Sequence, residues 1–251
     1  MSQITKVALA GATGNLGPAV LNELLEAGFE VTALVREGGA RSFPLRALQG
    51  QDAVVVTLGS ASFSKQHNLI EASVKAGVKR FILRVRLSYT LIINGPFLDW
   101  GLRSGFIFDV KGKSAQLLDG GDRTFSATTL SGVGKAIAGV LKNPEATKNR
   151  TVFVQEVETT QKALLEKAKK AIGADGWTVE EVPVATIVAA ATEELKKPNP
   201  NPGVWVVPFI KAAIFGEGYE SHYKTLDNDL LGVKQLTDDE LQAVVDDVAK
   251  A

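Results

Sequence analysis

The stretch that decides the fold is KVALAGATGNLG at residues 6–17, which is followed by PAVLNELL at residues 18–25. Its apolar opening predicts a short buried strand, and the second segment has the composition of a helix. Between them, Gly11, Gly14 and Gly17 are spaced G-x-x-G-x-x-G. In a dinucleotide-binding turn the first glycine permits the tight turn, the second lets the backbone approach a pyrophosphate, and the third lets the helix lie close to the strand. The order of strand, glycine turn and helix therefore predicts a nucleotide-binding loop.

Two neighbouring features support this prediction. The N–H groups at the start of such a helix face the phosphates, and Pro18 fits the first turn because its missing N–H costs nothing there. A second strand is predicted at residues 30–35, EVTALV. The alternative interpretation is a glycine-rich turn that serves packing alone.

Arg36 directly follows the second predicted strand. In a dinucleotide fold the end of this strand reaches the adenosine ribose, where an acidic residue would select NAD. Arg36 instead offers a cation to a 2′-phosphate. It therefore favours NADP(H) as the cofactor, although the adjacent Glu37 weakens this prediction and an exposed loop arginine is the alternative.

Composition excludes several classes of function. Lys+Arg and Asp+Glu both number 28, and no basic stripe is present, so nucleic acid is not expected as a main ligand. The absence of cysteine excludes disulfides, thiolate zinc sites and a cysteine nucleophile. No signal peptide precedes the first strand, and no apolar run reaches the ~18 residues of a membrane span. We therefore expect a cytoplasmic protein.

One connection is too short for a doubly wound sheet. Only residues 38–51 separate the second strand region from the next buried strand, which is predicted at residues 52–59, DAVVVTLG. A helix, a strand and another helix belong in that interval. We therefore expect a segment to be absent from the chain near residues 36–46.

A second connection is shorter still. Only residues 84–86 separate the strands predicted at residues 78–83 and 87–93. Parallel neighbours need a crossover of about a dozen residues. Either the two strands pair as a hairpin, which breaks the fold, or a segment is absent near residues 83–87, and we expect the latter.

The predicted fold class is α/β. A Rossmann-like doubly wound parallel sheet is expected at residues 1–155, followed by a smaller C-terminal α+β substrate domain at residues 156–251. At the carboxyl end of the strand predicted at residues 52–59, we expect the cofactor to contact Leu58, Gly59 and Ser60.

Three local patterns predict structure outside the sheet. Residues 94–101 are expected to form a loop that leaves a strand at its carboxyl end. Residues 106–118 are expected to form a hairpin covering the site. Thr237 and Glu240 form a capping box that starts the terminal helix.

Several segments together match one family pattern: GATGNLG at residues 11–17, LVR at 34–36, QHNLI at 66–70 with AGVKRFI at 76–82, and GPF at 95–97. With these segments the chain resembles the NmrA-like and isoflavone-reductase-like proteins, which are atypical short-chain dehydrogenase/reductases. The resemblance covers most of the chain and is strongest over residues 5–100.

This resemblance implies an NADP-binding Rossmann-like domain and a smaller C-terminal substrate domain. It implies that Arg36 binds the 2′-phosphate. It also implies that the residues at the pyrophosphate are Gly11, Thr13, Gly14, Asn15, Leu16 and Gly17.

The chain departs from the family pattern where the catalytic lysine is expected. After the strand at Phe81-Ile82 the family continues Pro-Ser-Glu-Phe-Gly and carries its lysine shortly afterwards, whereas residues 83–86 read LRVR here. The family lysine therefore corresponds to no residue of this chain, and the catalytic residue is unknown.

No other residue of the sequence fits a catalytic motif that could take the place of this lysine. A standard short-chain dehydrogenase uses Tyr-x-x-x-Lys, but no lysine stands four residues after Tyr89, Tyr219 or Tyr223. His67 lies near a predicted helix start and His222 lies in a loop, and either has an ordinary structural interpretation. With two histidines far apart and no cysteine, no metal site is expected.

Four aromatic residues lie near the expected site. Phe97, Trp100, Phe106 and Phe108 are interpreted either as an aromatic wall for a substrate or as ordinary core packing.

Two hypotheses of function follow. The first is an NADPH-dependent oxidoreductase that reduces a small, partly apolar or aromatic substrate by hydride transfer. The second is a non-catalytic, NADP-binding redox-sensing regulator that acts through a protein partner, as the resemblance to NmrA-like proteins implies. The first has a small molecule as its partner, and neither involves a membrane.

Overall fold

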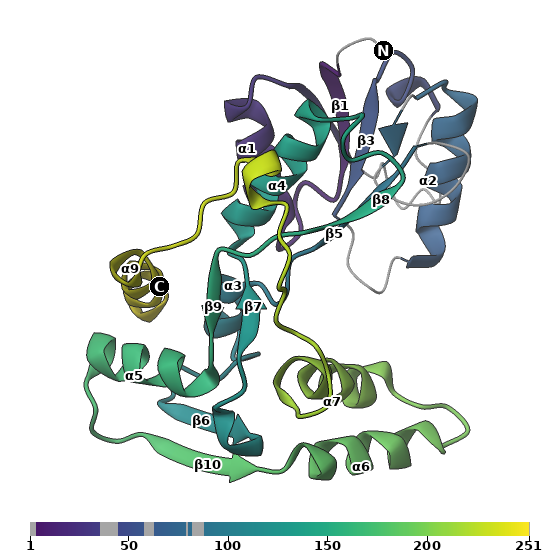
Figure 1. Cartoon of the computed structure of the whole chain (residues 1–251). Coiled ribbons are helices and arrows are strands. Elements are labelled where there is room, and N and C mark those ends of the chain that lie inside the picture. The colour runs from purple at the N-terminus through teal and green to yellow at the C-terminus, as the bar shows by residue number, and fades with distance from the viewer. Residues whose placement is uncertain (1–3, 36–44, 58–62, 79, 82–87, 251) are drawn as a thin grey trace. The chain divides into compact units, whose positions relative to one another are not determined.

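A computed structural model describes residues 4–35, 45–57, 63–78, 80–81 and 88–250 of the 251-residue chain. The architecture is α/β, as predicted, with parallel strands connected by helices (Figure 1). The chain divides into two compact units that alternate along the sequence. Unit 1 comprises residues 1–93, 130–154 and 226–234, and unit 2 comprises residues 94–129, 155–225 and 235–251.

Unit 1 contains a parallel sheet with strand order β2-β1-β3-β4, and a second parallel pair formed by β5 and β8. The chain leaves β1 toward β2 on one side and later adds β3 on the other side, which is the doubly wound pattern. Its elements are β1 (Lys6–Ala10), α1 (Gly17–Glu26), β2 (Glu30–Leu34), the 3-10 helix η1 (Leu45–Ala47), β3 (Ala53–Val56), α2 (Phe63–Lys75), β4 (Arg80–Phe81), β5 (Thr90–Ile93), α4 (Leu130–Lys142), β8 (Arg150–Phe153) and α8 (Asn228–Leu231).

The central strand β1 is buried on both faces. Its alternate residues Ala8 and Ala10 belong to one apolar cluster with Val54 of β3 and Leu69 of α2. Helices α1 and α4 pack against each other on the other side of the sheet (Figure 1). Because helices cover both faces, the strand is a continuous apolar run rather than an alternating one.

The outer strand β2 is much more exposed than β1. Glu30, Thr32 and Ala33 are exposed, and Val35 just beyond the strand is 68% exposed. Within the described part of the chain, no strand pairs with the outer edge of β2. Parallel strands are ordinarily covered on both faces, so β2 is unusually exposed for a strand of such a sheet. The segment predicted to be absent falls at residues 36–46, of which 36–44 lie outside the described residues.

The second short connection does not produce a hairpin. β4 pairs in parallel with β3, and β5 pairs in parallel with β8. The chain between them includes residues 82–87, which lie outside the described residues. The absence of a segment near residues 83–87 therefore stays a prediction.

Unit 2 has an aromatic core. Phe125 of β7 and Phe215 of α7 are fully buried, and their rings meet edge-on with centroids 5.1 Å apart. The elements of this unit are α3 (Leu98–Arg103), β6 (Ser114–Leu118), the 3-10 helix η3 (Asp119–Gly121), β7 (Phe125–Ala127), β9 (Val157–Thr159), α5 (Gln161–Ile172), β10 (Thr178–Val182), α6 (Val184–Leu195), α7 (Pro202–Phe215) and α9 (Asp238–Lys250).

Two local predictions in unit 2 are wrong. The hairpin predicted at residues 106–118 does not extend beyond one antiparallel bridge, and β6 pairs in parallel with the distant β10, with Ser114 opposite Thr178. Inside the predicted hairpin the described pairing is the isolated bridge between Asp109 and Ser114. The loop predicted at residues 94–101 turns into helix α3 at Leu98.

The predicted capping box is confirmed. The Thr237 N–H donates to Glu240 Oε2 at 2.7 Å, and the Glu240 N–H donates to Thr237 Oγ1 at 3.3 Å. This reciprocal pair satisfies two N–H groups at the start of α9.

Each unit is built from three segments that are separate in the sequence. The predicted boundary after residue 155 falls close to one passage between units, at Val154 and Gln155. Residues 94–129 belong to unit 2 and residues 226–234 to unit 1, because each segment packs mainly with strands and helices far away in sequence. No helix in the described ranges is long and apolar enough to cross a membrane.

Candidate functional site

The glycine loop follows the carboxyl end of β1 and its three glycines have distinct roles. Gly11 has a φ of +94°, and a Cβ there would lie 2.9 Å from the Thr57 carbonyl oxygen. A Cβ on Gly17 would lie 2.0 Å from the Gly11 carbonyl oxygen, so α1 can approach the turn only without a side chain at this position. Gly14 differs, because its Cβ would meet nothing nearer than 3.4 Å. The fold itself therefore requires Gly11 and Gly17, but it does not require Gly14.

The tip of the loop is open. Thr13, Gly14 and Asn15 are exposed, whereas Ala12 and Gly17 are buried. The Gly14 N–H donates to the Gly11 carbonyl at 3.0 Å, which closes the turn. A loop whose glycine is not demanded by its own packing, and whose tip is uncovered, has the form expected where a ligand contacts the backbone.

Helix α1 presents an uncapped amino terminus beside this loop. Its N-cap residue, Leu16, makes no side-chain capping hydrogen bond, Pro18 occupies the first turn, and that turn contains no acidic residue. The helix start therefore combines N–H groups without a side-chain cap with the positive end of the helix dipole. Such an end binds phosphate readily.

Thr57 is a site residue that the sequence analysis missed. Its hydroxyl lies 3.1 Å from the carbonyl oxygens of both Ala10 and Gly11, so its one O–H is shared between them. Its backbone N–H also donates to the Ala10 carbonyl at 2.9 Å. Thr57 thereby fixes the turn from the neighbouring strand, and its position directly after the apolar run of β3 was the available signal.

Three parallel strands end at the same edge of the sheet. Ala10 of β1 is in register with Leu34 of β2 and with Val56 of β3. In open α/β sheets, ligands bind outside this carboxyl edge, at the point where the strand order reverses. In this sheet the strand order reverses at β1, because β2 lies on one side of β1 and β3 on the other.

Several predicted cofactor residues cannot be placed. Arg36 follows the end of β2, and Leu58, Gly59 and Ser60 follow Thr57, but all four lie outside the described residues. Their contact with a cofactor stays a prediction.

The candidate catalytic residues make ordinary contacts. The Tyr89 N–H donates to Asn149 Oδ1 at 3.2 Å, Tyr219 is 52% exposed, and His222 Nε2 lies 2.9 Å from a Glu158 carboxylate oxygen. Burial raises the pKa of Tyr223, and a hydrogen bond from the Gly95 backbone partly opposes that rise. The side chain of His67 lies outside the described residues.

The four aromatic residues of the proposed wall fall into two sets. Phe108 is 3% exposed and its ring meets Trp177 edge-on, so it belongs to the core. Phe97, Trp100 and Phe106 are only half-buried, and their rings form a series with centroid distances of 6.4 and 6.2 Å. These three remain candidates for a substrate wall in unit 2.

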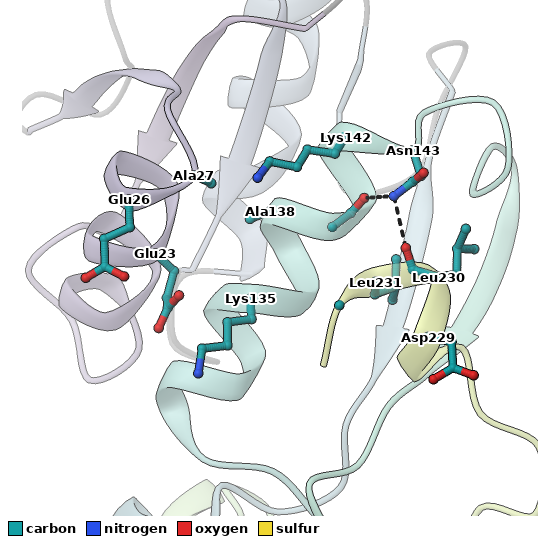
Figure 2. Close-up of a pocket in the computed structure, with 12 residues that line it drawn as sticks. Glu23, Glu26, Ala27, Lys135, Ala138, Lys142, Asn143, Asp229, Leu230 and Leu231 are labelled. Atoms are coloured by element: carbon teal, nitrogen blue, oxygen red, sulfur yellow. Dashed lines mark hydrogen bonds between the residues drawn. The ribbon is translucent and has the colours of Figure 1, made fainter. Parts of the chain in front are cut away.

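Figure 2 shows a pocket in unit 1 that is not the glycine loop. It encloses about 430 Å³ between α1, α4 and α8, and Asn143 donates to the Gly139 and Leu230 carbonyls at its side. Its lining on α1 includes Glu23 and Glu26, about two turns or more beyond Gly17. Lys135 and Lys142 also line the pocket, but with Glu23, Glu26 and Asp229 beside them the lining offers no excess of positive charge to an anionic nucleotide. No group of three metal-binding side chains occurs in the described part of the chain.

Comparison with known proteins agrees with this geometry. No protein-family model matches the chain. The oxidoreductase poxI of Penicillium oxalicum is 28% identical over 297 residues, covering 96% of this chain and 93% of the relative. Because the alignment is longer than the 251 residues of this chain, the relative carries residues that the chain lacks.

Solved structures match nearly the whole chain. Isoflavone reductase has a TM-score of 0.72 and 16% identity, covering 98% of this chain and 99% of its own. The chain has the isoflavone-reductase-like fold. The Escherichia coli NADPH-dependent quinone oxidoreductase QOR2, solved with NADPH, has a TM-score of 0.67 and 19% identity, covering 96% of this chain and 99% of its own. The predicted resemblance is thus confirmed at the level of the fold.

Proposed function

We propose that this protein is an NADPH-dependent oxidoreductase that reduces a small, partly apolar or aromatic molecule. The observation that carries the proposal is the open glycine loop beside an uncapped helix start, at the carboxyl edge of a doubly wound sheet. Support comes from a relative named as an oxidoreductase and from the NADPH-bound quinone oxidoreductase with the same fold.

The chain's own residues fit a dinucleotide. The pyrophosphate would be held by backbone N–H groups of the loop from Gly11 to Gly17, where an exposed tip leaves room and no acidic side chain opposes it in the first turn of α1. Arg36 would bind the 2′-phosphate through charge-assisted hydrogen bonds. When bound, NADPH supplies a hydride, and the protein supplies orientation.

Arg36→Ala tests the choice of nucleotide. We expect NADPH affinity to fall about 10- to 100-fold, because a charged hydrogen bond to the 2′-phosphate is lost, while NADH affinity is unchanged. Calorimetric titration with both nucleotides measures the difference. Equal loss for NADPH and NADH, or equal affinity of the unmodified protein for the two, would contradict the role of Arg36.

Gly14→Ala tests the loop. A Cβ at this position meets no protein atom nearer than 3.4 Å, so the melting temperature should stay within the error of the measurement. NADPH affinity should fall about tenfold, because the methyl group stands where the pyrophosphate approaches. A variant that binds NADPH as well as the unmodified protein would show that the phosphates lie elsewhere.

Turnover tests the reductase itself. NADPH oxidation should be measured against enones, phenylpropanoids and quinones, with Gly14→Ala as the matched variant of reduced nucleotide affinity. We expect at least one class to be reduced, with lower activity at limiting NADPH in the variant. Tight NADPH binding without any turnover would contradict the reductase and favour the NADP-binding regulator.

A further inference from the structure

Lys211 stands out because of the helix that carries it. Helix α7 reads PGVWVVPFIKAAIF, so Lys211 is its only charged residue. A helix that is apolar on all sides is ordinarily buried, yet Val204, Val207 and Ile210 of α7 are each more than 40% exposed. A single charged residue in such an apolar helix is unusual and indicates a specific role for Lys211.

The ammonium group of Lys211 is half-buried and faces an aromatic ring. Its Nζ lies 5.6 Å from the ring centroid of Phe106, close to the ~6 Å limit of a cation–π contact. Burial lowers the pKa of Lys211, and burial is its sole resolved cause. Within the described ranges, no carboxylate is ion-paired with this amine, in contrast to Lys162, Lys167 and Lys197 of the same unit.

The ring that faces Lys211 belongs to a series of aromatic side chains. Phe106 is the middle ring of a series that runs from Trp100 to Phe215, with centroid distances of 6.2 Å on each side. Phe97, Trp100 and Phe106 are only half-buried, so the series begins at the accessible surface of unit 2 and ends in its core. A half-buried cation without a carboxylate is costly to fold, and perturbed groups of this kind gather at functional sites.

We propose that Lys211, with Phe106 and Trp100, forms a binding site for a flat aromatic molecule that carries an anionic or carbonyl oxygen. The rings contact the apolar faces of the molecule, and the ammonium donates a hydrogen bond to the oxygen. That this molecule is the substrate rests on the proposed reductase function. If the carbonyl carbon of such a substrate accepted the hydride of NADPH, the negative charge left on the oxygen would be stabilised by the ammonium, which would also donate the proton that completes the alcohol.

The test uses two probes of equal shape and different charge, 1-naphthoate and the neutral 1-naphthylmethanol, titrated calorimetrically without any nucleotide. The unmodified protein should bind naphthoate about tenfold more tightly, the usual effect of a charged hydrogen bond. Lys211→Met should abolish this preference by weakening naphthoate alone. Lys211→Arg should keep most of it.

Lys196→Met is the matched control. Lys196 is exposed at the C-cap of α6, and its ion pair among the described residues is with Glu193 of that helix, so its removal should leave the preference intact. Lys211→Gln provides a second, polar replacement should the methionine variant fold poorly. Unchanged naphthoate affinity in Lys211→Met, absence of binding to the unmodified protein, or equal loss in Lys196→Met would overturn the proposal.

Stability separates this role from a purely structural one. If Lys211 serves mainly to hold α7 through Phe106, Lys211→Met should lower the melting temperature. If the charge is kept for a ligand, removing it should leave the melting temperature unchanged or raise it. Because neither titration contains NADPH, a failure of the reductase function would leave this result intact, and the reverse also holds.

Discussion

Gly17→Ala is expected to destabilise unit 1 strongly and to prevent NADPH binding. The added Cβ would lie 2.0 Å from the Gly11 carbonyl oxygen and 2.5 Å from the Ala12 carbonyl carbon. Both are backbone atoms of the turn, so no side-chain rotation relieves the clash. Overpacking typically costs about 1–3 kcal/mol, and a contact this close to backbone atoms lies at the upper end of that range, about 3 kcal/mol. We expect α1 to move away from β1.

The measurement pairs thermal unfolding with NADPH titration. A loss of about 3 kcal/mol should lower the melting temperature by roughly 6–12 °C in a chain of this size. Gly14→Ala is the matched control, since it adds the same methyl group to the same loop with only ordinary contacts. Equal melting temperatures for the two variants would refute the close approach of α1 to the turn.

The sequence predicted the loop because its constraint is local. A strand, three spaced glycines and a helix follow one another within residues 6–25, so the spacing of the glycines is enough to predict the turn. Thr57 was missed although it holds the same turn, because its hydroxyl reaches Gly11 from a different strand. Only the parallel register of β1 and β3 brings these two residues together.

The unit 2 elements show the same limit. The capping box at Thr237 and Glu240 was predicted because both residues belong to one helical turn. The partner of β6 was not predicted, because three strands and two α-helices separate β10 from β6 in the chain, and pairing over such a separation leaves no local pattern. Lys211 was overlooked for a similar reason, since its neighbour Phe106 lies on a distant part of the chain.

Gly95→Ala is expected to have the largest effect in unit 2. Gly95 has a φ of +66°, and its Cβ would lie 2.0 Å from the Ser126 carbonyl oxygen in β7. The segment after Gly95 is held beside the end of this strand, because the Leu98 N–H donates to the carbonyl of Thr128, the residue directly after β7, at 2.9 Å. Both backbone segments are held by hydrogen bonds, so we expect a loss of about 3 kcal/mol from overpacking, the upper end of the usual range, and about 1–2 kcal/mol from the left-handed backbone.

Gly218→Ala separates these two contributions. Gly218 lies in the same unit with a φ of +87°, but a Cβ there would meet nothing within 4 Å. This variant should therefore lose only the backbone contribution of about 1–2 kcal/mol. Urea unfolding measures the free energy of unfolding of both variants, and the two values are compared provided that the slope m against urea concentration is the same. A Gly95 variant no less stable than the Gly218 variant would mean that the turn is not pressed against β7, and that Phe97 and Trp100 are not held in place by that contact.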